Sequence, residues 1–376
     1  MKNSVTRTTP DGEALVTAYL HSRANAAGIP LAGTFELTSR CNFSCRMCYV
    51  HENVESSREL TGAEWIALGR QARDAGMLYL LLTGGEPFLR KDFPQIYREL
   101  RRMGLIVSIN TNGSLLTDEL LEVLTQDTPS RVNVSLYGGS ADTYRSLCRA
   151  DGYEKVTGNI LRMKEAGLQV KLNLAVTPYN AQDVPLIYQF AKEHHLPIQC
   201  TTYMYPPVRV NGGCFGEAPA RFDAEEAARQ MLLCREQILT PEQLAASAGF
   251  PVEDSCGEEV GSPMSCRAGR TTFWITWDGK MMPCGTFPTE SAHDVRTLGF
   301  GEAWKMVRGF TARIRMSPEC TGCSLRKSCP ACAASCLAET GSPSIKPDYL
   351  CRYTRHLRKL TVEKYGLKGD SHEAES

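Results

Sequence analysis

A repeated unit, a helix pattern followed by a strand pattern, constrains this chain more than any other feature. Three amphipathic helix patterns end in Gly76, Gly104 and Gly167, and a short apolar run begins directly after each glycine. Glycine at that position is typical of a helix C-cap, which takes a left-handed backbone conformation. The six expected strands cover residues 33–38, 77–82, 105–111, 131–136, 168–176 and 198–203. Because strands that alternate with helices pair in parallel through βαβ crossovers, we expect an α/β fold with a partial (βα)6 barrel of the TIM type.

The length and charge of the chain exclude several classes of protein. At 376 residues the chain is long enough for two domains. Its formal net charge of +0 argues against a nucleic-acid-binding protein, which must neutralise many phosphates. The first residues carry no apolar signal-peptide core, and no apolar run approaches the ~20 residues that a membrane span needs. We therefore expect a cytoplasmic protein that binds neither nucleic acid nor membrane, and whose sixteen cysteines serve mainly as metal ligands rather than as disulfides.

A cysteine triplet follows the first expected strand. Cys41, Cys45 and Cys48 stand at C-x3-C-x2-C spacing within the segment CNFSCRMCY. Three thiolates at this spacing can hold one iron–sulfur cluster. A four-iron cluster normally takes four cysteine ligands, so a triplet leaves one iron open to a small molecule. The alternative is a zinc knuckle that takes a fourth ligand from elsewhere in the chain, because Zn²⁺ also binds C-x2-C pairs.

The segment TGGEP, residues 83–87, directly follows the second expected strand. Its adjacent glycines allow backbone to approach a ligand closely, and Glu86 offers an acceptor for a cationic amine. Together, CNFSCRMCY and TGGEP closely resemble the motifs of the radical S-adenosylmethionine (SAM) superfamily. The resemblance implies that the open iron of a [4Fe-4S] cluster chelates the amino and carboxylate groups of SAM, while the GGEP segment binds the amine.

Polar residues at the ends of later strands are further candidates for contacts with SAM. Ligands of such barrels lie at the carboxyl ends of the strands, where Thr111, Asn112 and Ser135 stand. The resemblance places ribose-binding and carboxylate-binding groups on these strands; the alternative is that these residues serve as turn or capping residues. The residues that we expect to contact SAM are Tyr49, Gly84, Gly85, Glu86, Pro87, Thr111, Asn112 and Ser135. The sequence assigns a catalytic role to no side chain.

The C-terminal part of the chain is rich in cysteine. Nine of the sixteen cysteines lie in residues 256–351. Two of them, Cys266 and Cys284, flank the hairpin pattern TTFWITWDGKMMPC, in which Asp278 and Gly279 are expected to form a two-residue turn. A run with C-x2-C-x5-C spacing follows. Zinc is the alternative for a C-x2-C pair, but the whole arrangement closely resembles the SPASM domain, a C-terminal cysteine-rich iron–sulfur domain.

The SPASM resemblance implies two auxiliary [4Fe-4S] clusters. The expected ligands of one are Cys320, Cys323, Cys329 and Cys351. The expected ligands of the other, nearer the barrel, are Cys256, Cys266, Cys284 and one of Cys332 and Cys336. A turn of helix can present either of the last two, and we favour Cys332. The alternative for Cys256 is an ordinary thiol in a linker.

Two positions in the barrel depart from the pattern of relatives with a SPASM-type tail. Many of these relatives carry aspartate where this chain has Tyr137, and arginine where it has Leu147. Arg145 and Arg149 lie nearby in sequence, but neither falls in register. The family's carboxylate-binding residues are therefore not carried over to this chain.

The expected divisions of the chain follow from these segments. They are an N-terminal helical segment at 1–32, the barrel at 33–204, bridging helices at 205–255, the SPASM domain at 256–352, and a C-terminal helix and tail at 353–376. In the first segment, a helix over 12–28 is expected to pack through an apolar face made of Leu15, Tyr19 and the alanines near Ala26.

The resemblance also implies an activity. An electron from the cluster would cleave SAM to methionine and a 5′-deoxyadenosyl radical, which abstracts hydrogen from a substrate carbon. SPASM relatives mostly modify peptides or proteins, so we expect ribosomal-peptide maturation by oxidation or crosslinking; Gly285 disfavours the sulfatase-maturase branch. The alternatives are a radical SAM dehydrogenase or haem-pathway enzyme acting on a small molecule and, with least support, a non-enzymatic iron–sulfur electron carrier. The expected partners are a peptide or protein substrate, a reductant such as flavodoxin or ferredoxin, and a separate leader-peptide-binding protein.

Overall fold

The computed structural model describes residues 15–48, 58–206, 220–248, 264, 266–288 and 291–366. In this part of the chain, nine strands form one sheet in the order β6-β5-β4-β3-β2-β1-β7-β8-β9. The strands are β1 Ala32–Glu36, β2 Tyr79–Thr83, β3 Ile106–Thr111, β4 Arg131–Ser135, β5 Val170–Ala175, β6 Ile198–Thr201, β7 Thr272–Ile275, β8 Lys280–Met282 and β9 His293–Asp294.

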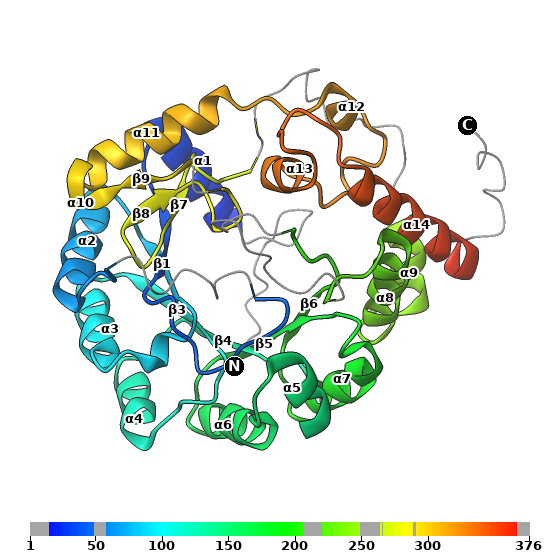
Figure 1. Ribbon diagram of the computed structural model, residues 1–376, viewed down its shortest axis with the longest axis horizontal. Helices are drawn as coiled ribbons and strands as arrows, with labels where there is room; N and C mark the ends of the chain where they lie inside the picture. Colours follow the sequence, from blue (N-terminus) through cyan, green and yellow to red (C-terminus); the bar gives the residue numbers. More distant parts are fainter. Residues whose placement is uncertain are drawn as a thin grey trace.

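Strands β1 to β6 pair in parallel, in the order in which they follow one another along the chain. Helices lie on the outer side of this curved sheet and ring it (Figure 1). They are α2 Gly62–Asp74, α3 Phe93–Arg102, α4 Asp118–Gln126, α5 Ala141–Cys148, α6 Tyr153–Glu165 and α7 Val184–Glu193. The connections also contain two short 3-10 helices, η1 Pro87–Leu89 and η2 Ala181–Asp183. The predicted α/β fold with a parallel sheet is thereby confirmed.

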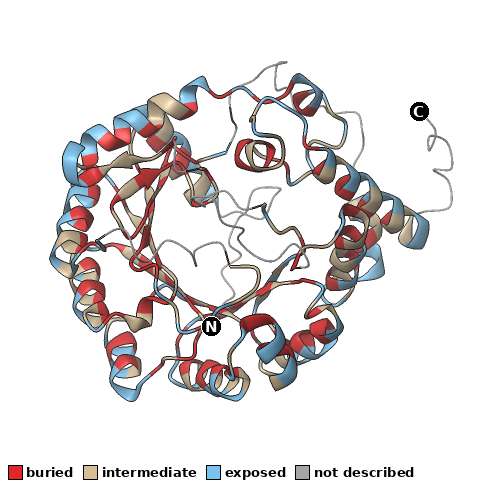
Figure 2. Cartoon of the chain, viewed as in Figure 1, coloured by how far each residue is buried: buried red, intermediate tan, exposed pale blue. Residues whose placement is uncertain are grey.

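The residues of β3 show how the two faces of the sheet differ. Val107 and Ile109 are fully buried, whereas Ser108 and Asn110, which alternate with them, are only half-buried. Because side chains alternate between the faces of a strand, the apolar pair packs against the helices and the polar pair faces the inside of the curve. Figure 2 shows the same division, with buried residues concentrated where the helices meet the sheet.

The predicted glycine caps are confirmed. Gly76, Gly104 and Gly167 have φ of +104°, +84° and +82°, the left-handed region that ends a helix. Each glycine follows a helix directly and turns the chain into the next strand. Local sequence therefore sets where three of the parallel strands begin.

The predicted hairpin is present, but its turn is longer than expected. Strand β7 pairs in parallel with β1 and antiparallel with β8, so the hairpin extends the sheet of the barrel. Thr276 accepts a hydrogen bond from Gly279 N–H at 2.9 Å and donates one to Lys280 O at 3.0 Å, both through its backbone. The predicted two-residue turn is wrong, because residues 277–279 form a three-residue loop. Gly279, with φ of +83°, takes the left-handed position that closes such loops.

The C-terminal helices form smaller cores beside the barrel. The helices that follow β6 in the described part of the chain are α8 Ala224–Glu236, α9 Pro241–Ala248, α10 Val295–Leu298, α11 Phe300–Arg313, α12 Pro318–Thr321, α13 Ala333–Thr340 and α14 Asp348–Tyr365. Apolar residues of α8, α9 and α14 pack together in one cluster, while the tail around α13 forms another. Because β7 to β9 continue the barrel sheet, the division of the chain into a barrel and a SPASM domain stays a prediction.

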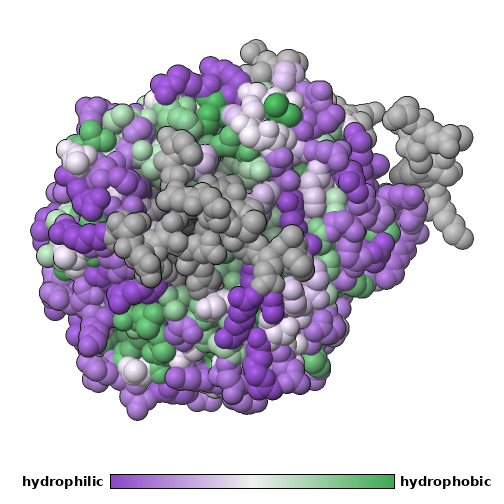
Figure 3. Space-filling view, viewed as in Figure 1, coloured by the Kyte–Doolittle hydropathy of each residue, from purple (hydrophilic) through white to green (hydrophobic). Residues whose placement is uncertain are grey.

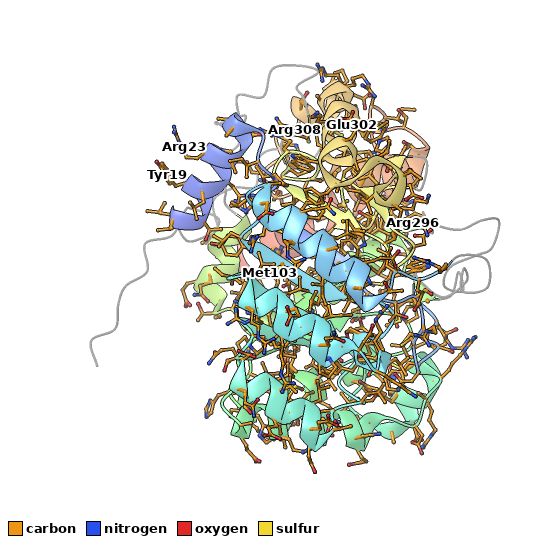
Figure 4. The ribbon with its side chains drawn as sticks, turned by 90° about the vertical axis from the view of Figure 1, so that its left-hand side faces the viewer. Tyr19, Arg23, Met103, Arg296, Glu302 and Arg308 are labelled. Atoms are coloured by element: carbon orange, nitrogen blue, oxygen red, sulfur yellow. The ribbon has the colours of Figure 1, made fainter. Side chains whose placement is uncertain are left out.

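Helix α1, Leu15–Ala27, does not pack through the predicted face. Leu15 and Tyr19 are 45% and 63% exposed, so the prediction of an apolar packing face is wrong for these two residues. Figure 4 shows Tyr19 and Arg23 on the outer side of this helix. His21 and Ala24 are buried instead, and His21 Nδ1 lies 2.8 Å from Thr271 Oγ1. A specific polar contact and a small residue, rather than apolar spacing, decide how this helix docks.

No helix within the described ranges is long and apolar enough to cross a membrane. The longest of them, α14, has 18 residues and leaves Arg352, Arg355 and Arg358 exposed. The face of the molecule in Figure 3 is hydrophilic around most of its rim.

Candidate active site

The predicted cluster and SAM motifs meet at the edge of the sheet where β1 to β4 end. The cysteine segment follows β1, and TGGEP begins in the last residue of β2. Thr111 and Ser135 are the last residues of β3 and β4. Parallel strands bring their carboxyl ends to one edge of the sheet, where barrels of this kind bind ligands. Tyr49, the remaining predicted contact of SAM, lies outside the described residues.

The cysteine loop is held against the C-terminal end of α5. Ser44 N–H donates to Cys148 O at 3.1 Å, and Arg46 N–H donates to Leu147 O at 3.0 Å. The three predicted cluster cysteines are all half-buried. The loop therefore has a fixed backbone and presents its thiols at a depth that a cofactor can reach.

The chemistry of the three thiols fits an iron–sulfur cluster. Burial, and then the negative charges of Glu86, Cys45 and Cys48, raise the pKa of the Cys41 thiol to about 12. A metal centre favours the thiolate form, so it would relieve this cost. Among the described residues, no group of three or more His, Cys, Asp or Glu converges on the position of a single metal ion. The cysteines of a cluster bind separate irons, and three half-buried thiols on one short loop suit that kind of site; the assignment of the cluster to these cysteines stays a prediction.

Gly84 and Gly85 pack directly against the backbone that leads into the cysteine loop. Gly85 N–H donates to Thr38 O at 2.7 Å, and Glu86 N–H donates to Arg40 O at 2.8 Å. A Cβ atom on Gly84 would lie 2.7 Å from Thr38 O, and one on Gly85 would lie 2.3 Å from Arg40 O. The glycines therefore let two protein segments approach each other. Their contact with SAM, expected from the sequence, stays a prediction.

The Glu86 carboxylate is fully buried and held by three donors. Oε1 accepts from Phe88 N–H at 3.0 Å and from the Thr111 hydroxyl at 2.8 Å, and Oε2 accepts from Asn112 N–H at 2.6 Å. Burial raises the pKa of Glu86 to about 7, against the lowering effect of these hydrogen bonds. A carboxylate has about four acceptor positions, so one is left for a cationic amine, whose charge would favour the ionised form. Pro87 is buried directly beside this carboxylate, at the start of η1.

Tyr137 stands two residues after Ser135, just beyond the end of β4, and its side chain is half-buried. Burial raises the pKa of the Tyr137 phenol, a hydrogen bond with the Ser135 side chain lowers it, and negative charge at Cys45 raises it. Arg145 instead forms ion pairs with two exposed aspartates. Whether the phenol takes part in the site stays a prediction.

A buried ionic network brackets the cysteine loop, and no sequence motif signals it. Arg90 Nη1 donates to Leu37 O at 2.8 Å, before the loop, and to Leu60 O at 2.9 Å, after it. Glu59 accepts hydrogen bonds from Thr38 Oγ1 at 2.6 Å and from the next backbone N–H at 3.1 Å. Both ends of the loop are thereby fixed to each other and to the segment after GGEP.

Replacing Arg90 by leucine is expected to lower the free energy of unfolding by about 3 kcal/mol and to reduce cluster occupancy. Two buried carbonyl groups would lose their donor, and Asp92, 2.7 Å from the guanidinium, would lose its ionic partner. Denaturant titration and iron content measure the two effects. The control is Arg102→Leu, which removes an arginine that is 69% exposed beside Glu99 on α3 and should change stability by at most about 0.5 kcal/mol. Equal stability of the two variants would contradict the role of Arg90.

One group of tail cysteines contains Cys266, Cys284 and Cys332. Burial raises the pKa of both Cys266 and Cys284, and negative charge at Cys332 raises both further. Cys332 stands at the N-cap of α13. Cys336 is buried one turn later, and its pKa is raised first by burial and then by charge at Cys320, Cys332 and Cys329, which belong to both groups. This placement supports Cys332 as the ligand nearer the barrel.

The second group of tail cysteines surrounds a cavity of about 190 Å³. Its cysteines are Cys320, Cys323, Cys329 and Cys351. The cavity is also lined by Arg326, Lys346 and Arg355, whose positive charges suit an anionic cluster with thiolate ligands. Cys256 lies outside the described residues.

Comparison with known proteins identifies the class of the chain. Residues 35–191 match the Radical SAM superfamily. A probable GTP 3′,8-cyclase of Saccharolobus solfataricus is 35% identical over 276 residues, which cover 71% of this chain and 86% of that protein. The AdoMet-dependent heme synthase of Methanosarcina barkeri is 26% identical over 325 residues, which cover 82% of this chain and 92% of that protein.

A solved structure shares the fold. Streptococcus suis SuiB, bound to its precursor peptide SuiA, superposes with a TM-score of 0.65 at 18% identity, over 93% of this chain and 83% of that one. At this identity the likeness concerns the fold alone. With the family match, the relatives and the motifs at the strand ends, the chain is an enzyme of the radical SAM superfamily, whose members use a [4Fe-4S] cluster and SAM.

Proposed function

We propose that this enzyme cleaves SAM at a cluster held by Cys41, Cys45 and Cys48 and oxidises or crosslinks a peptide. The observation that carries the proposal is the convergence of the half-buried thiols and the buried Glu86 carboxylate at one edge of the sheet. When bound, the cluster supplies the electron that splits SAM into methionine and a 5′-deoxyadenosyl radical. Glu86 accepts a hydrogen bond from the methionyl amine, and the Thr111 hydroxyl group orients the Glu86 carboxylate by donating to it.

We further propose that the tail binds two auxiliary clusters. Nine cysteines lie in residues 256–351, and two four-iron clusters need eight thiolates. The two groups of described cysteines would supply seven ligands: four at the cavity, and three in the group of Cys266, Cys284 and Cys332. Cys256 is the proposed eighth ligand, which would leave no open iron in the nearer cluster. The tail would then accept an electron from the substrate, so that the net reaction is an oxidation.

The inner face of the sheet supports a peptide as the substrate. Asn133 Nδ2 donates to Asn110 Oδ1 at 2.9 Å, and Asn173 is half-buried on the same face of β5. Amide side chains pair well with the N–H and C=O groups of a peptide backbone. A triphosphate would instead favour several cations. The charged inward side chains of the described β3 to β6, Arg131 and Lys171, stand near the amino ends of their strands, away from the site.

A small-molecule substrate is the second candidate function. The relative named as a heme synthase aligns over 325 residues, or 82% of this chain. The relative named as a probable GTP cyclase aligns with 71% of it. In that case the substrate of this enzyme would be a metabolite instead of a peptide.

Substrate-dependent SAM cleavage distinguishes the two candidates. Anaerobically reconstituted protein is mixed with SAM, dithionite and one addition: a peptide fraction from cells that encode the protein, GTP, or an iron porphyrin. The peptide fraction is expected to raise 5′-deoxyadenosine formation above the background without substrate, with loss of two hydrogen atoms from one peptide mass. Stimulation by GTP or by the porphyrin alone would contradict the peptide proposal and support the second candidate.

A further inference from the structure

Two N–H groups converge on the sulfur of Cys41. The backbone N–H of Phe43 lies 3.4 Å from Cys41 Sγ, and Nδ2 of Asn112 lies 3.7 Å from the same atom. The first donor belongs to the cysteine loop, and the second follows strand β3. One donor therefore comes from within the loop, and the other comes from a residue 71 positions further along the chain.

The side chain of Asn112 belongs to a closed ring of hydrogen bonds. Its Nδ2 donates to Asn42 Oδ1 at 2.9 Å, and Asn42 Nδ2 donates to Ser114 Oγ at 2.8 Å. The Ser114 hydroxyl closes the ring by donating to Asn112 Oδ1 at 2.7 Å. Asn42 directly follows Cys41, so the ring fixes the first turn of the cysteine loop to the end of β3.

The ring also fixes which way the Asn112 amide points. Oxygen and nitrogen of an amide are exchangeable in shape, so the network must assign them. The backbone N–H of Ser114 can only donate, and it lies 2.9 Å from Asn112 Oδ1. The oxygen must therefore face Ser114, which leaves the nitrogen for Cys41.

The Asn112 amide has no capacity left for another ligand. An amide offers two N–H donors and two lone pairs. The donors go to Asn42 and Cys41, and both lone pairs go to Ser114. The backbone N–H of Asn112 is also engaged, with Glu86 Oε2 at 2.6 Å.

We propose that Asn112 is a positioning residue that donates a hydrogen bond to the Cys41 sulfur and raises the reduction potential of the cluster, rather than a ligand of SAM through its side chain. The proposal rests on Cys41 being a cluster ligand. Hydrogen bonds to the sulfurs of a cluster favour the reduced state, because that state carries more negative charge. Removing the donor should therefore make the cluster harder to reduce.

The test is a redox titration of the reconstituted holoenzyme, monitored by the electron paramagnetic resonance signal that changes when SAM is added. Asn112→Leu keeps the approximate size of the side chain and removes its donors. We expect a more negative midpoint potential, equivalent to roughly fivefold less reduced cluster at a fixed reductant potential, with SAM affinity changed less than about twofold. The control is Asn110→Leu, on the same strand, because the Asn110 amide accepts from Asn133 rather than contacting a sulfur; its potential should not move.

The outcomes separate the proposal from its premise. An unchanged potential in Asn112→Leu overturns the proposal, whether or not SAM affinity falls. If that variant does not retain the cluster, Asn112→Ala decides by the same measurement, since it removes the same donor to the Cys41 sulfur without placing a bulky apolar group in the ring, and it should shift the potential in the same direction. The premise is tested apart: a Cys41→Ala protein that keeps the SAM-responsive signal would show that Cys41 is not a ligand.

Discussion

A Gly85→Ala variant is expected to lose cluster binding and SAM cleavage while its barrel remains folded. The new Cβ would lie 2.3 Å from Arg40 O, 2.6 Å from Arg40 C and 2.7 Å from Ser39 O. All three atoms are backbone, so no side-chain rotation can relieve the clash. The segment before the cysteines must move, and the hydrogen bond from Glu86 N–H to Arg40 O, 2.8 Å in the native protein, is broken.

The replacement disturbs the backbone that leads into the cysteine loop rather than the packing of the hydrophobic core. We expect the free energy of unfolding to fall by roughly 3 kcal/mol, the sum of an overpacking strain and a lost buried hydrogen bond. Iron content and 5′-deoxyadenosine formation measure the functional loss. Gly158→Ala is the matched control, because the space beside Gly158 on α6 is open and alanine is the better helix former. If Gly85→Ala loads iron and cleaves SAM like Gly158→Ala, the packing argument is wrong.

Replacing Cys41, Cys45 and Cys48 together by alanine is expected to abolish 5′-deoxyadenosine formation. No other described cysteine group lies beside Glu86, whose charge contributes to the raised pKa of Cys41. The proposed tail clusters should remain, since the cysteines proposed to bind them lie in residues 256–351. The variant should therefore keep the visible absorbance of iron–sulfur clusters but form no 5′-deoxyadenosine.

The control for the triple variant is Cys200→Ala, which removes a half-buried thiol of β6 that has no proposed part in cluster binding. Its SAM cleavage should match that of the native protein. Product formation by the triple variant at the rate of this control would show that SAM is cleaved elsewhere.

The parallel sheet was predictable because its signals are local. Each repeat carries its own helix pattern, its glycine cap and its apolar strand, and Gly104 takes the left-handed conformation that the pattern predicts. The turn of the tail hairpin was not predictable from its Asp-Gly pair, which occurs in both two-residue and three-residue loops. Pairing of β7 with β1 joins residues 240 positions apart, such as Ala32 and Thr272, and no local pattern encodes it.

The site shows the same limit. The thiols and Glu86 are recognisable as motifs, because their chemistry depends on residue type and spacing. Arg90 acts through backbone carbonyl groups of Leu37 and Leu60, which any residue supplies, so its partners leave no trace in the sequence. Asn112 was predicted as a contact of SAM, which stays a prediction, and the contact of its side chain with the Cys41 sulfur is visible only in the geometry of its four hydrogen-bonded neighbours.

The iron content of the anaerobically reconstituted protein tests the account most directly. One cluster at the cysteine loop and two in the tail predict about twelve irons per chain, falling to about eight in the variant without Cys41, Cys45 and Cys48. A native content near four irons, lost completely in that variant, would contradict the auxiliary clusters. A content unchanged by the triple replacement would contradict the cluster at the loop.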